Sequence, residues 1–599
     1  MIVAMSKAYI VAGKADRDRL LAALGRLGVV HLKPVEAARA VADAETVAVL
    51  DRLNRAIQVL EAQAPAGQAP ALSAADAAQE VLRIQRESAE RNSRLSLLHR
   101  QIEQLALWGD VRIEQLQALA QAGVDLKFFA VPRALVGQFR AECVHQIAPW
   151  PGKRVLVAVI QRGGEAQAPE DAEPVPLPDR DRPTLRAEAA AIDAALRADA
   201  ERLTRLAHLL GDMQAERARL RAHAAWTVAT RSALDSDRLY ALQGWVPADK
   251  AAHLAADLRA EGVEAAVEAA PADPGEEPPT LLRYPWWARP MEGLFKILGT
   301  VPGYTEFDVS AMFMIFLPIF SAILISDTGY GLIYLLAPLI FYRKMAAAGA
   351  EALAQLVIVI GACSVIWGVL TGSFFGFNMC EWPVFGRVFP QPVVAIDMKK
   401  ESMDFLMLLS ITLGAVHLIL AHLWKAKAAF PGLAFLSELG WCIWLVGMYG
   451  LVGMFLLKSP FAMGVAPYYP WWLIVGGALA ILFAAPDKNP LKMIGLGLAN
   501  FPLSAIGTFG DTVSYVRLMA IGLAGGALAL AFNSMGASLP WWAMIPVLAA
   551  GHALNVALSI ISIFAHGVRL NMLEFSNNLG MQWSGYLYEP FSKTDSQEN

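Results

Sequence analysis

A single arginine lies inside a long apolar stretch of the sequence, between residues 508 and 533. Arg517 is followed by a run, from 518 to 533, that contains no other charged residue. A stretch of this length and composition predicts a membrane span, which needs about 20 residues. An arginine near the bilayer centre costs about 2.5–3.5 kcal/mol. This cost indicates that the charge has a function.

The predicted helix places mostly small residues on the face of Arg517. At steps of three, four, seven and eight, this face carries Ser514, Gly510, Ala520, Ile521, Ala524 and Gly525. Small side chains let another helix approach closely. We therefore expect a packed helix beside the guanidinium group. The alternative is an arginine that reaches a lipid headgroup or pairs inside the bundle.

A second set of polar residues lies on the last apolar stretch. At steps of three and four it carries His552, Asn555, Ser559, Ser562, His566 and Arg569. On an α-helix these residues form one stripe, about 26 Å long. Such a stripe can bind water, and histidine can pass protons near neutral pH. Glu574 follows Arg569 and could pair with it or mark the cytoplasmic mouth.

Four other intramembrane polar residues are interpreted as structural or interface groups: Asp327, His417, His422 and Glu438. The run Gly368–Gly376 has small residues at four-residue steps, which predicts close helix contacts.

The composition changes near Pro290. Before it the chain is rich in Ala, Arg, Glu and Asp, and after it apolar runs dominate. We therefore predict a soluble part, residues 1–290, and a transmembrane part, residues 291–599. The net charge of −4 does not favour nucleic acid as a partner. The four cysteines lie far apart, without metal-ligand or disulfide-framework spacing.

The soluble part predicts α/β lobes joined by long helices. Strand, helix and strand are expected over 6–34, and a second α/β unit begins at Leu126 and includes a helix over 133–142. Two long apolar seams flank this unit, which indicates an antiparallel coiled-coil arm. The predicted fold class is mainly α: N-terminal cytoplasmic α/β lobes joined by that arm, and a C-terminal eight-helix transmembrane domain.

The transmembrane part predicts about eight spans. They are expected at about 309–325, 329–342, 352–376, 403–423, 437–457, 469–485, 508–533 and 542–575. Pairs of basic residues in alternate loops, such as Arg343 and Lys344, favour a cytoplasmic N-terminus and C-terminus. The start of the chain lacks the basic residues and long apolar core of a signal peptide, so the soluble part is expected in the cytoplasm.

Motifs for nucleotide chemistry are missing from the sequence. It contains neither a Gly-x-x-x-x-Gly-Lys-Ser/Thr loop nor a Gly-x-Gly-x-x-Gly after a strand. The histidines of the soluble part are scattered and are interpreted as ordinary surface or packing residues. We therefore predict no catalytic site, cofactor or metal, and read the arm as a strut or docking element.

Taken in order, seven motifs resemble the membrane stator subunit of rotary V/A-type ATPases, called subunit a or subunit I, in its prokaryotic form. They are Gly244-Trp-Val-Pro247, Pro278-Pro-Thr-Leu-Leu282, Tyr304-Thr-Glu-Phe-Asp308, Asp327-Thr-Gly-Tyr-Gly331, Trp367-Gly-Val-Leu-Thr-Gly-Ser-Phe-Phe-Gly376, Ser514-Tyr-Val-Arg-Leu518 and His566-Gly-Val-Arg-Leu570. The resemblance covers essentially the whole chain.

The resemblance implies roles for several residues. Arg517 would face a ring of c (proteolipid) subunits, attract each passing carboxylate and separate two ion half-channels. Arg569 would assist it, and His566 matches a polar position on the channel-lining helix. The chain departs from eukaryotic members at Ser559, where they carry an acid, and 503–507 lacks an upstream acidic residue.

The resemblance also implies partners and a location. The partners are the c ring, peripheral stalk subunits, soluble ATPase subunits and the lipid bilayer. The location is a prokaryotic cell membrane, and the transported ion is H⁺ or Na⁺.

Two other interpretations compete with this one. A stand-alone secondary transporter would use the intramembrane arginines to bind an anion, although the sequence shows no repeated halves. A membrane scaffold would dock partners through its arm and keep the polar stripe as a structural feature. Co-purification with a proteolipid ring would favour the stator.

Overall fold

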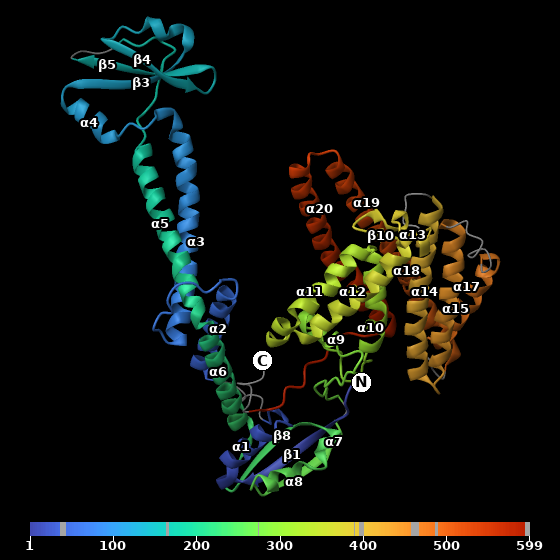
Figure 1. Ribbon diagram of the computed structural model, residues 1–599. Helices are drawn as coiled ribbons and strands as arrows, with labels where there is room; N and C mark the ends of the chain where they lie inside the picture. Colours follow the sequence, from blue (N-terminus) through green and yellow to red (C-terminus); the bar gives the residue numbers. More distant parts are fainter. Residues whose placement is uncertain are drawn as a thin grey trace. The chain divides into compact units, whose positions relative to one another are not determined.

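Strand β1 lies inside a five-stranded antiparallel sheet whose strands come from both ends of the soluble part (Figure 1). The computed structural model describes residues 1–592 apart from 36–42, 163–166, 274, 389, 395–399, 457–465 and 485–488. The strands are β1 (Met5–Gly13), β2 (His31–Lys33), β7 (Leu234–Asp235), β8 (Leu239–Pro247) and β9 (Ala265–Ala270). Helices α1 (Arg17–Leu27), α7 (Ala248–Ala251) and α8 (Leu254–Ala260) complete the lobe. This confirms the strand–helix–strand prediction for 6–34.

Glycine is required where β2 pairs with β8. A Cβ atom on Gly244 would lie 2.6 Å from the backbone oxygen of His31, closer than carbon and oxygen can approach. The next residue, Trp245, is fully buried. The Gly-Trp-Val-Pro motif therefore has a packing role in this sheet.

The described chain divides into two units. One contains residues 1–35 and 234–592, and the other contains 36–233. The first unit thus joins the N-terminal lobe to the apolar helices. The division at residue 290 between a soluble and a transmembrane part stays a prediction.

The second unit is built on paired long helices. They are α2 (Ala44–Leu60), α3 (Ala74–Gln104), α4 (Ile113–Gln121), α5 (Arg182–Leu206) and α6 (Leu210–Ser232). Ion pairs join α3 to α5 with partner numbers that run in opposite directions: Glu80–Arg202, Arg91–Asp199 and Arg94–Glu188. The two helices are therefore antiparallel, as predicted. Their coiled-coil geometry stays a prediction.

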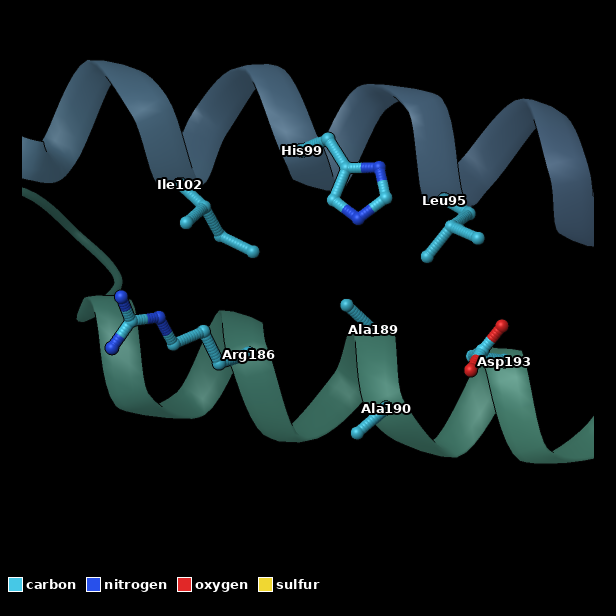
Figure 2. A pocket seen from close by; sticks show the side chains of 7 residues that line it. All are labelled: Leu95, His99, Ile102, Arg186, Ala189, Ala190 and Asp193. Atoms are coloured by element: carbon cyan, nitrogen blue, oxygen red, sulfur yellow. The ribbon is translucent and has the colours of Figure 1, made fainter. Parts of the chain in front are cut away.

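A groove of about 460 Å³ lies between α3 and α5 (Figure 2). Figure 2 shows Ala189 and His99 facing each other across it, with Arg186 and Asp193 on the α5 side. Since alanine fills little of the space between two helices, the groove follows from the small residues of α5.

A four-stranded antiparallel sheet lies between α4 and α5 in the sequence. It contains β3 (Val124–Pro132), β4 (Cys143–Trp150), β5 (Arg154–Arg162) and β6 (Glu173–Pro174). The helix predicted over 133–142 is wrong, because a 3₁₀ segment covers only Arg133–Gln138 and the chain is extended from Phe139. Phe139 and Val136 still reach the core of this sheet, so their apolar spacing reflects burial rather than an α-helix.

The rest of the first unit is mostly helical. In order come α9 (Met291–Leu298), α10 (Ser310–Ile325), α11 (Thr328–Ala347), α12 (Glu351–Thr371), α13 (Phe385–Val388), α14 (Lys400–Ala429), α15 (Ala434–Leu456), α17 (Tyr469–Leu482), α18 (Pro490–Ser514), α19 (Val516–Ala537), α20 (Trp541–Ser562) and α21 (Ser576–Leu579). A hairpin of β10 (Ser373–Phe374) and β11 (Phe377–Asn378) follows α12.

Within the described ranges, five helical stretches are long and apolar enough to cross a membrane: Glu351–Thr371, Lys400–Ala429, Ala434–Met454, Leu491–Ala537 and Trp541–Leu579. Helices α10 and α17 are apolar but shorter. The chain is thus a membrane protein, and the number of eight spans stays a prediction.

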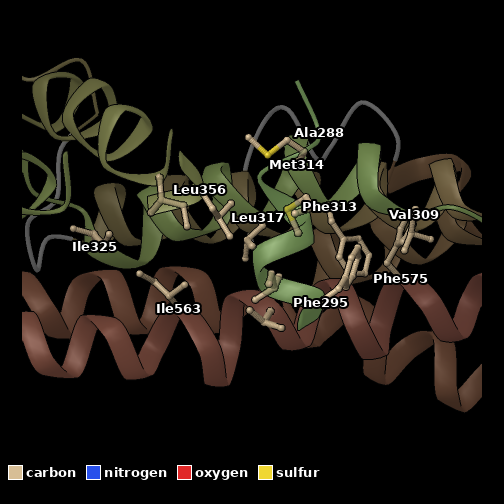
Figure 3. Close-up of a cluster of buried hydrophobic side chains, with 14 of the residues drawn as sticks. Ala288, Phe295, Val309, Phe313, Met314, Leu317, Ile325, Leu356, Ile563 and Phe575 are labelled. Carbon is tan, nitrogen blue, oxygen red and sulfur yellow. The ribbon is translucent and has the colours of Figure 1, made fainter. Parts of the chain in front are cut away.

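The main core of this unit packs α9, α10 and α12 against the last helix (Figure 3). Figure 3 shows Phe295, Phe313 and Phe575 converging, and the rings of Phe313 and Phe575 meet edge to face at 6.3 Å. These aromatic contacts fix the end of the last helix against the start of α10.

Close contact between α11 and α12 depends on small residues. A Cβ atom on Gly368 would lie 2.2 Å from the backbone nitrogen of Thr328, and one on Gly361 would lie 2.5 Å from that of Leu335. This confirms close helix contact at Gly368, whereas α12 ends at Thr371, so Gly372 and Gly376 of the predicted run lie outside the helix.

We expect Gly368→Ala to destabilise the protein by about 1–3 kcal/mol, because backbone atoms would have to move to admit the methyl group. The apparent Tm of the detergent-solubilised chain should fall. Gly495→Ala is the matched control, because no atom lies within 4 Å of its added Cβ. An unchanged Tm for Gly368→Ala would contradict this close packing.

Candidate functional site

A buried tyrosine sets the position of Arg517. Helix α18 ends at Ser514, α19 begins at Val516, and Tyr515 between them is fully buried. Its hydroxyl group hydrogen bonds to Nδ1 of His417 on α14, at 2.8 Å. Gly414 makes room for the ring, since a Cβ there would lie 2.4 Å from it. Tyr515 therefore anchors the start of α19 to α14.

Arg517 itself is half-buried. Its Nη1 atom is buried and has no hydrogen-bond partner in the described part of the chain, where Arg517 also forms no ion pair. A buried guanidinium group without an acceptor is costly. An acceptor that the described residues do not supply would therefore stabilise Nη1.

The last helix changes its winding where the second arginine lies. After α20, residues Ile563–Val568 and Leu570–Phe575 form π-helical turns, called η8 and η9. In a π-helix, residues five apart lie one turn apart. Nε of Arg569 accordingly lies 3.7 Å from Oε1 of Glu574. π-Turns are rare and occur often at functional sites.

The two arginines and two titratable groups form one cluster. The charges of Arg517 and Arg569 both interact with His566 and with Glu574. Glu574 is 3% exposed, and its Oε2 atom is buried without a partner, as is Nδ1 of His566. Arg569 is half exposed. Four of the predicted site residues are thus brought together.

The upper part of the predicted stripe packs against other helices. Nδ2 of Asn555 donates to the hydroxyl group of Tyr330 on α11 and to the carbonyl of Gly525 on α19, at 3.0 Å each. The Tyr330 hydroxyl lies 2.8 Å from Nδ1 of His552. His552 and Asn555 therefore hold α20 against α11 and α19.

The predicted serines bond to their own helices. The hydroxyl groups of Ser559, Ser562 and Ser514 each donate to the carbonyl four residues earlier, at 2.8–2.9 Å. Each oxygen keeps acceptor capacity for water. Ser559 is buried, whereas the other two are half-buried.

Asp327 is a structural residue, as interpreted from the sequence. Its buried carboxylate accepts hydrogen bonds from Gly329 N, Tyr330 N, Phe375 N, Gly376 N and the Ser373 hydroxyl. It thereby fixes the β10–β11 hairpin to the start of α11. The hairpin also explains why α12 ends at Thr371, before the predicted end of that span at 376.

A chain of polar side chains that we did not predict joins α14 and α15 to the arginine cluster. Nδ2 of Asn578 donates to Oδ2 of Asp511 at 2.8 Å and to the carbonyl of Glu574 at 2.6 Å. His422 contacts Oδ1 of Asn578 at 3.2 Å and Oε2 of Glu438 at 2.8 Å. When its ring carries two protons, His422 donates to both oxygens.

This chain ends at a basic residue. Nζ of Lys425 lies 2.9 Å from Oε1 of Glu438, and the Lys425 side chain is 39% exposed, so this end of the chain of polar residues reaches the surface. Asp511 is six residues before Arg517, within the apolar stretch 508–533. That position was the available signal for Asp511, whereas the contacts through Asn578 require the tertiary structure.

None of the described residues forms a group of three or more His, Cys, Asp or Glu side chains that could hold a metal ion.

The comparisons with known proteins agree on one class. The chain is 29% identical to V-type ATP synthase subunit I 1 of Treponema pallidum, over 99% of this chain and 100% of that protein. It is 32% identical to V-type ATP synthase subunit I of Borreliella burgdorferi, over 59% of this chain and 60% of that protein. It is 26% identical to A-type ATP synthase subunit I of Methanocaldococcus jannaschii, over 59% of this chain and 55% of that protein. The chain thus spans little more than half of the last two relatives.

No protein-family model matches the chain. A solved structure of the cytoplasmic N-terminal domain of subunit I, a homologue of subunit a of V-ATPase, is 16% identical and covers 44% of this chain and 99% of that one. Its TM-score is 0.19, so this likeness carries no argument.

The apolar helices fit a membrane protein, and the relatives are V-type and A-type ATP synthase subunit I proteins from bacteria and archaea.

Proposed function

We propose that the chain is the stator membrane subunit of a rotary V/A-type ATPase. It forms two ion half-channels against a ring of c (proteolipid) subunits. Translocation of H⁺ or Na⁺ through them is coupled to ATP hydrolysis or synthesis. The observation that carries this proposal is the buried, unpaired Nη1 atom of Arg517.

The surface beside Arg517 supports contact with a helix of another subunit. Small residues along α18 and α19 are exposed: Gly507, Gly510, Ala520, Ala524, Ala527 and Ala531. In an 18-residue apolar window of Leu491–Ala537, 28% is buried, whereas the corresponding window of Lys400–Ala429 is 50% buried. An exposed face of small residues in an apolar helix is typical of close helix packing.

The chemistry of the gate follows from opposite charges. The guanidinium group of Arg517 attracts a ring carboxylate and favours its deprotonated form. An ion from one half-channel then neutralises this carboxylate, which can enter the lipid after it leaves the arginine. Each elementary charge that crosses 100 mV exchanges about 2.3 kcal/mol, so several ions are coupled to each ATP.

The polar side chains divide between two paths. We assign Lys425, Glu438, His422, Asn578 and Asp511 to the cytoplasmic half-channel, because their hydrogen bonds run from an exposed lysine toward Arg517.

His566, Glu574 and Arg569 lie at the gate. Ser514, Ser559 and Ser562 supply oxygens for water in the second path, and His552 and Asn555 hold its helix in place. Histidine and carboxylate groups are suited to proton relay.

The proposal includes the setting of the subunit. The N-terminal domain and the C-terminus lie in the cytoplasm of a prokaryotic cell. Residues 36–233 resist torque and contact peripheral stalk subunits, while the soluble ATPase subunits carry the nucleotide sites. The chain itself is non-catalytic and works in a lipid bilayer.

Co-purification tests the proposal. The chain, isolated from membranes in mild detergent, should bring down a proteolipid ring and soluble ATPase subunits, and ATP should drive ion uptake by the reconstituted complex. A chain that isolates alone and transports an anion in liposomes would instead support a stand-alone transporter. A chain that isolates with partners but moves no ion would support a scaffold.

A further inference from the structure

The segment after the last helix is hydrogen-bonded along its length, first to the helical part of the first unit and then to the N-terminal lobe. It begins at Met581, directly after α21, and its described part ends at Ser592. Figure 1 shows it passing from the helices of the first unit to the sheet that contains β1 and β8. All of these residues belong to the same unit.

The first contacts of this segment fix it to the helices. The carboxylate of Glu306 accepts hydrogen bonds from the backbone nitrogens of Gln582 and Trp583, at 2.6 and 3.3 Å. The ring of Trp583 lies 5.7 Å from that of Phe295 on α9. The nitrogen of Gly585 donates to the carbonyl of Val301 at 3.2 Å.

The middle of the segment pairs with a buried threonine. The backbone nitrogen of Thr280 donates to the carbonyl oxygen of Tyr586 at 2.8 Å. The carbonyl oxygen of Thr280 accepts from the backbone nitrogen of Tyr588 at 3.1 Å. Its hydroxyl group donates to the carbonyl of Pro302 at 2.8 Å, and it is fully buried. Thr280 therefore ties the segment to the linker that enters the helices.

The end of the segment lies on β2 and the turn before it. The hydroxyl group of Tyr588 donates to the carbonyl oxygen of Val29 at 2.5 Å. The backbone nitrogen of Phe591 donates to the carbonyl oxygen of Val30 at 2.8 Å. The nitrogen of Glu589 lies 3.1 Å from Nδ1 of His31 and donates to it.

A segment bonded in this way transmits force, whereas a flexible linker of the same length does not. We propose that residues 581–591 form a clamp that holds the helix carrying Arg569 at a fixed height against the N-terminal lobe, and that neutral His31 closes it. The role of Arg569 in this statement rests on the proposed function. His31 acts through the helix, so it is a positioning residue.

The neutral ring of His31 is required because Nδ1 must accept a hydrogen bond from the backbone N–H of Glu589. A second ring proton would place two donors opposite each other and break this hydrogen bond. Burial lowers the pKa of His31, and the Glu589 carboxylate opposes this shift. The other titratable groups near the ring are Tyr586 and Tyr588 on the clamp and Lys33 on β2, which pairs with Glu276.

The lowered pKa of His31 sets the direction in which pH changes the stability of the clamp. Because the closed clamp disfavours the proton, closure is fully favoured above the ordinary histidine pKa of about 6.5. Below this pKa, the equilibrium constant for closing the clamp falls by up to about tenfold per pH unit, until the pH passes the lowered pKa of His31. Acidification of the compartment that holds the lobe is therefore expected to release the clamp.

Hydrogen exchange of the full chain in detergent tests the clamp, with times corrected for the pH dependence of intrinsic exchange. Between pH 7.5 and pH 5.5, the protection of peptide 586–592 should fall, by up to about tenfold. The protection of strand β1 should stay unchanged. Protection of 586–592 that is the same at both pH values would overturn the proposal.

Two variants distinguish the role of His31 in closing the clamp from a general loss of structure. In His31→Asn the amide oxygen can replace Nδ1 as acceptor but does not titrate, so protection should persist at both pH values. His31→Phe, which has no acceptor, should release 586–592 at both. If the protection of 586–592 in His31→Asn follows the wild-type pH profile, His31 does not control the clamp.

A functional measurement then links the clamp to coupling. His31→Phe in the whole complex should lower the number of ions pumped per ATP at pH 7.5, and His31→Asn should restore it. If Arg517→Ala still pumped, the proposed function would fail while the exchange result stood. Unchanged coupling in His31→Phe would overturn the clamp's role and leave the Arg517 result intact.

Discussion

Arg517→Ala is expected to abolish ATP-driven ion pumping, by at least about a hundredfold, in membranes that contain the assembled complex. The reason is that the substitution removes the only positive charge of α19, which no described side chain pairs with or replaces at that position. Removal of one preorganised electrostatic group typically costs this much. Ion uptake into inverted vesicles, measured with H⁺ and with Na⁺, is the assay.

A lysine variant distinguishes charge from shape. Arg517→Lys keeps the charge but loses the planar fork that binds a carboxylate through two nitrogens. We expect it to pump poorly and to stay closed to passive ions, whereas Arg517→Ala should leak, because no positive charge remains between the half-channels. Arg343→Ala, at an exposed position of α11, is the matched control and should pump normally. Normal pumping by Arg517→Ala with an intact complex would refute the stator mechanism.

Asp511→Asn should slow pumping by about two orders of magnitude, the usual effect of losing a positioned proton-transfer group. Asp511 accepts a hydrogen bond from Asn578 and interacts with the charge of His422. It thus links the chain from Glu438 to the region of Arg517. An asparagine has nearly the same size but cannot take up a proton.

The control for Asp511→Asn is Glu401→Gln, which neutralises an exposed acid at the start of α14. Both variant complexes should assemble with wild-type yield. Solvent isotope effects on pumping should also change in Asp511→Asn, which a loss of packing alone would not cause. Wild-type pumping by Asp511→Asn would remove Asp511 from the path.

Most of the fold followed from sequence patterns that depend on nearby residues. A short apolar run identified β1, and the spacing of apolar residues along two long seams identified α3 and α5. These patterns work because a strand or helix with one buried face must repeat at its own period. The pattern failed at 133–142, where apolar residues at helical spacing pack a 3₁₀ segment and extended chain against a sheet.

The predicted stripe on the last helix shows the limit of periodicity. Steps of three and four assume α-helical winding, but the π-turns from Ile563 to Phe575 bring Arg569 to Glu574 across five residues. The sequence also did not reveal that Tyr330, more than two hundred residues earlier, would bind His552 and Asn555. That partner is set by packing between helices.

The sequence by itself determined that an arginine lies within an apolar span and that small residues share its face, because both depend only on residue type and spacing. Tertiary structure decided which polar residues reach that arginine. Tyr515 anchors it through His417 on another helix, and Asp511 gains its neighbours through Asn578. Such contacts join positions far apart in the chain, and only the packed helices bring them within hydrogen-bond distance.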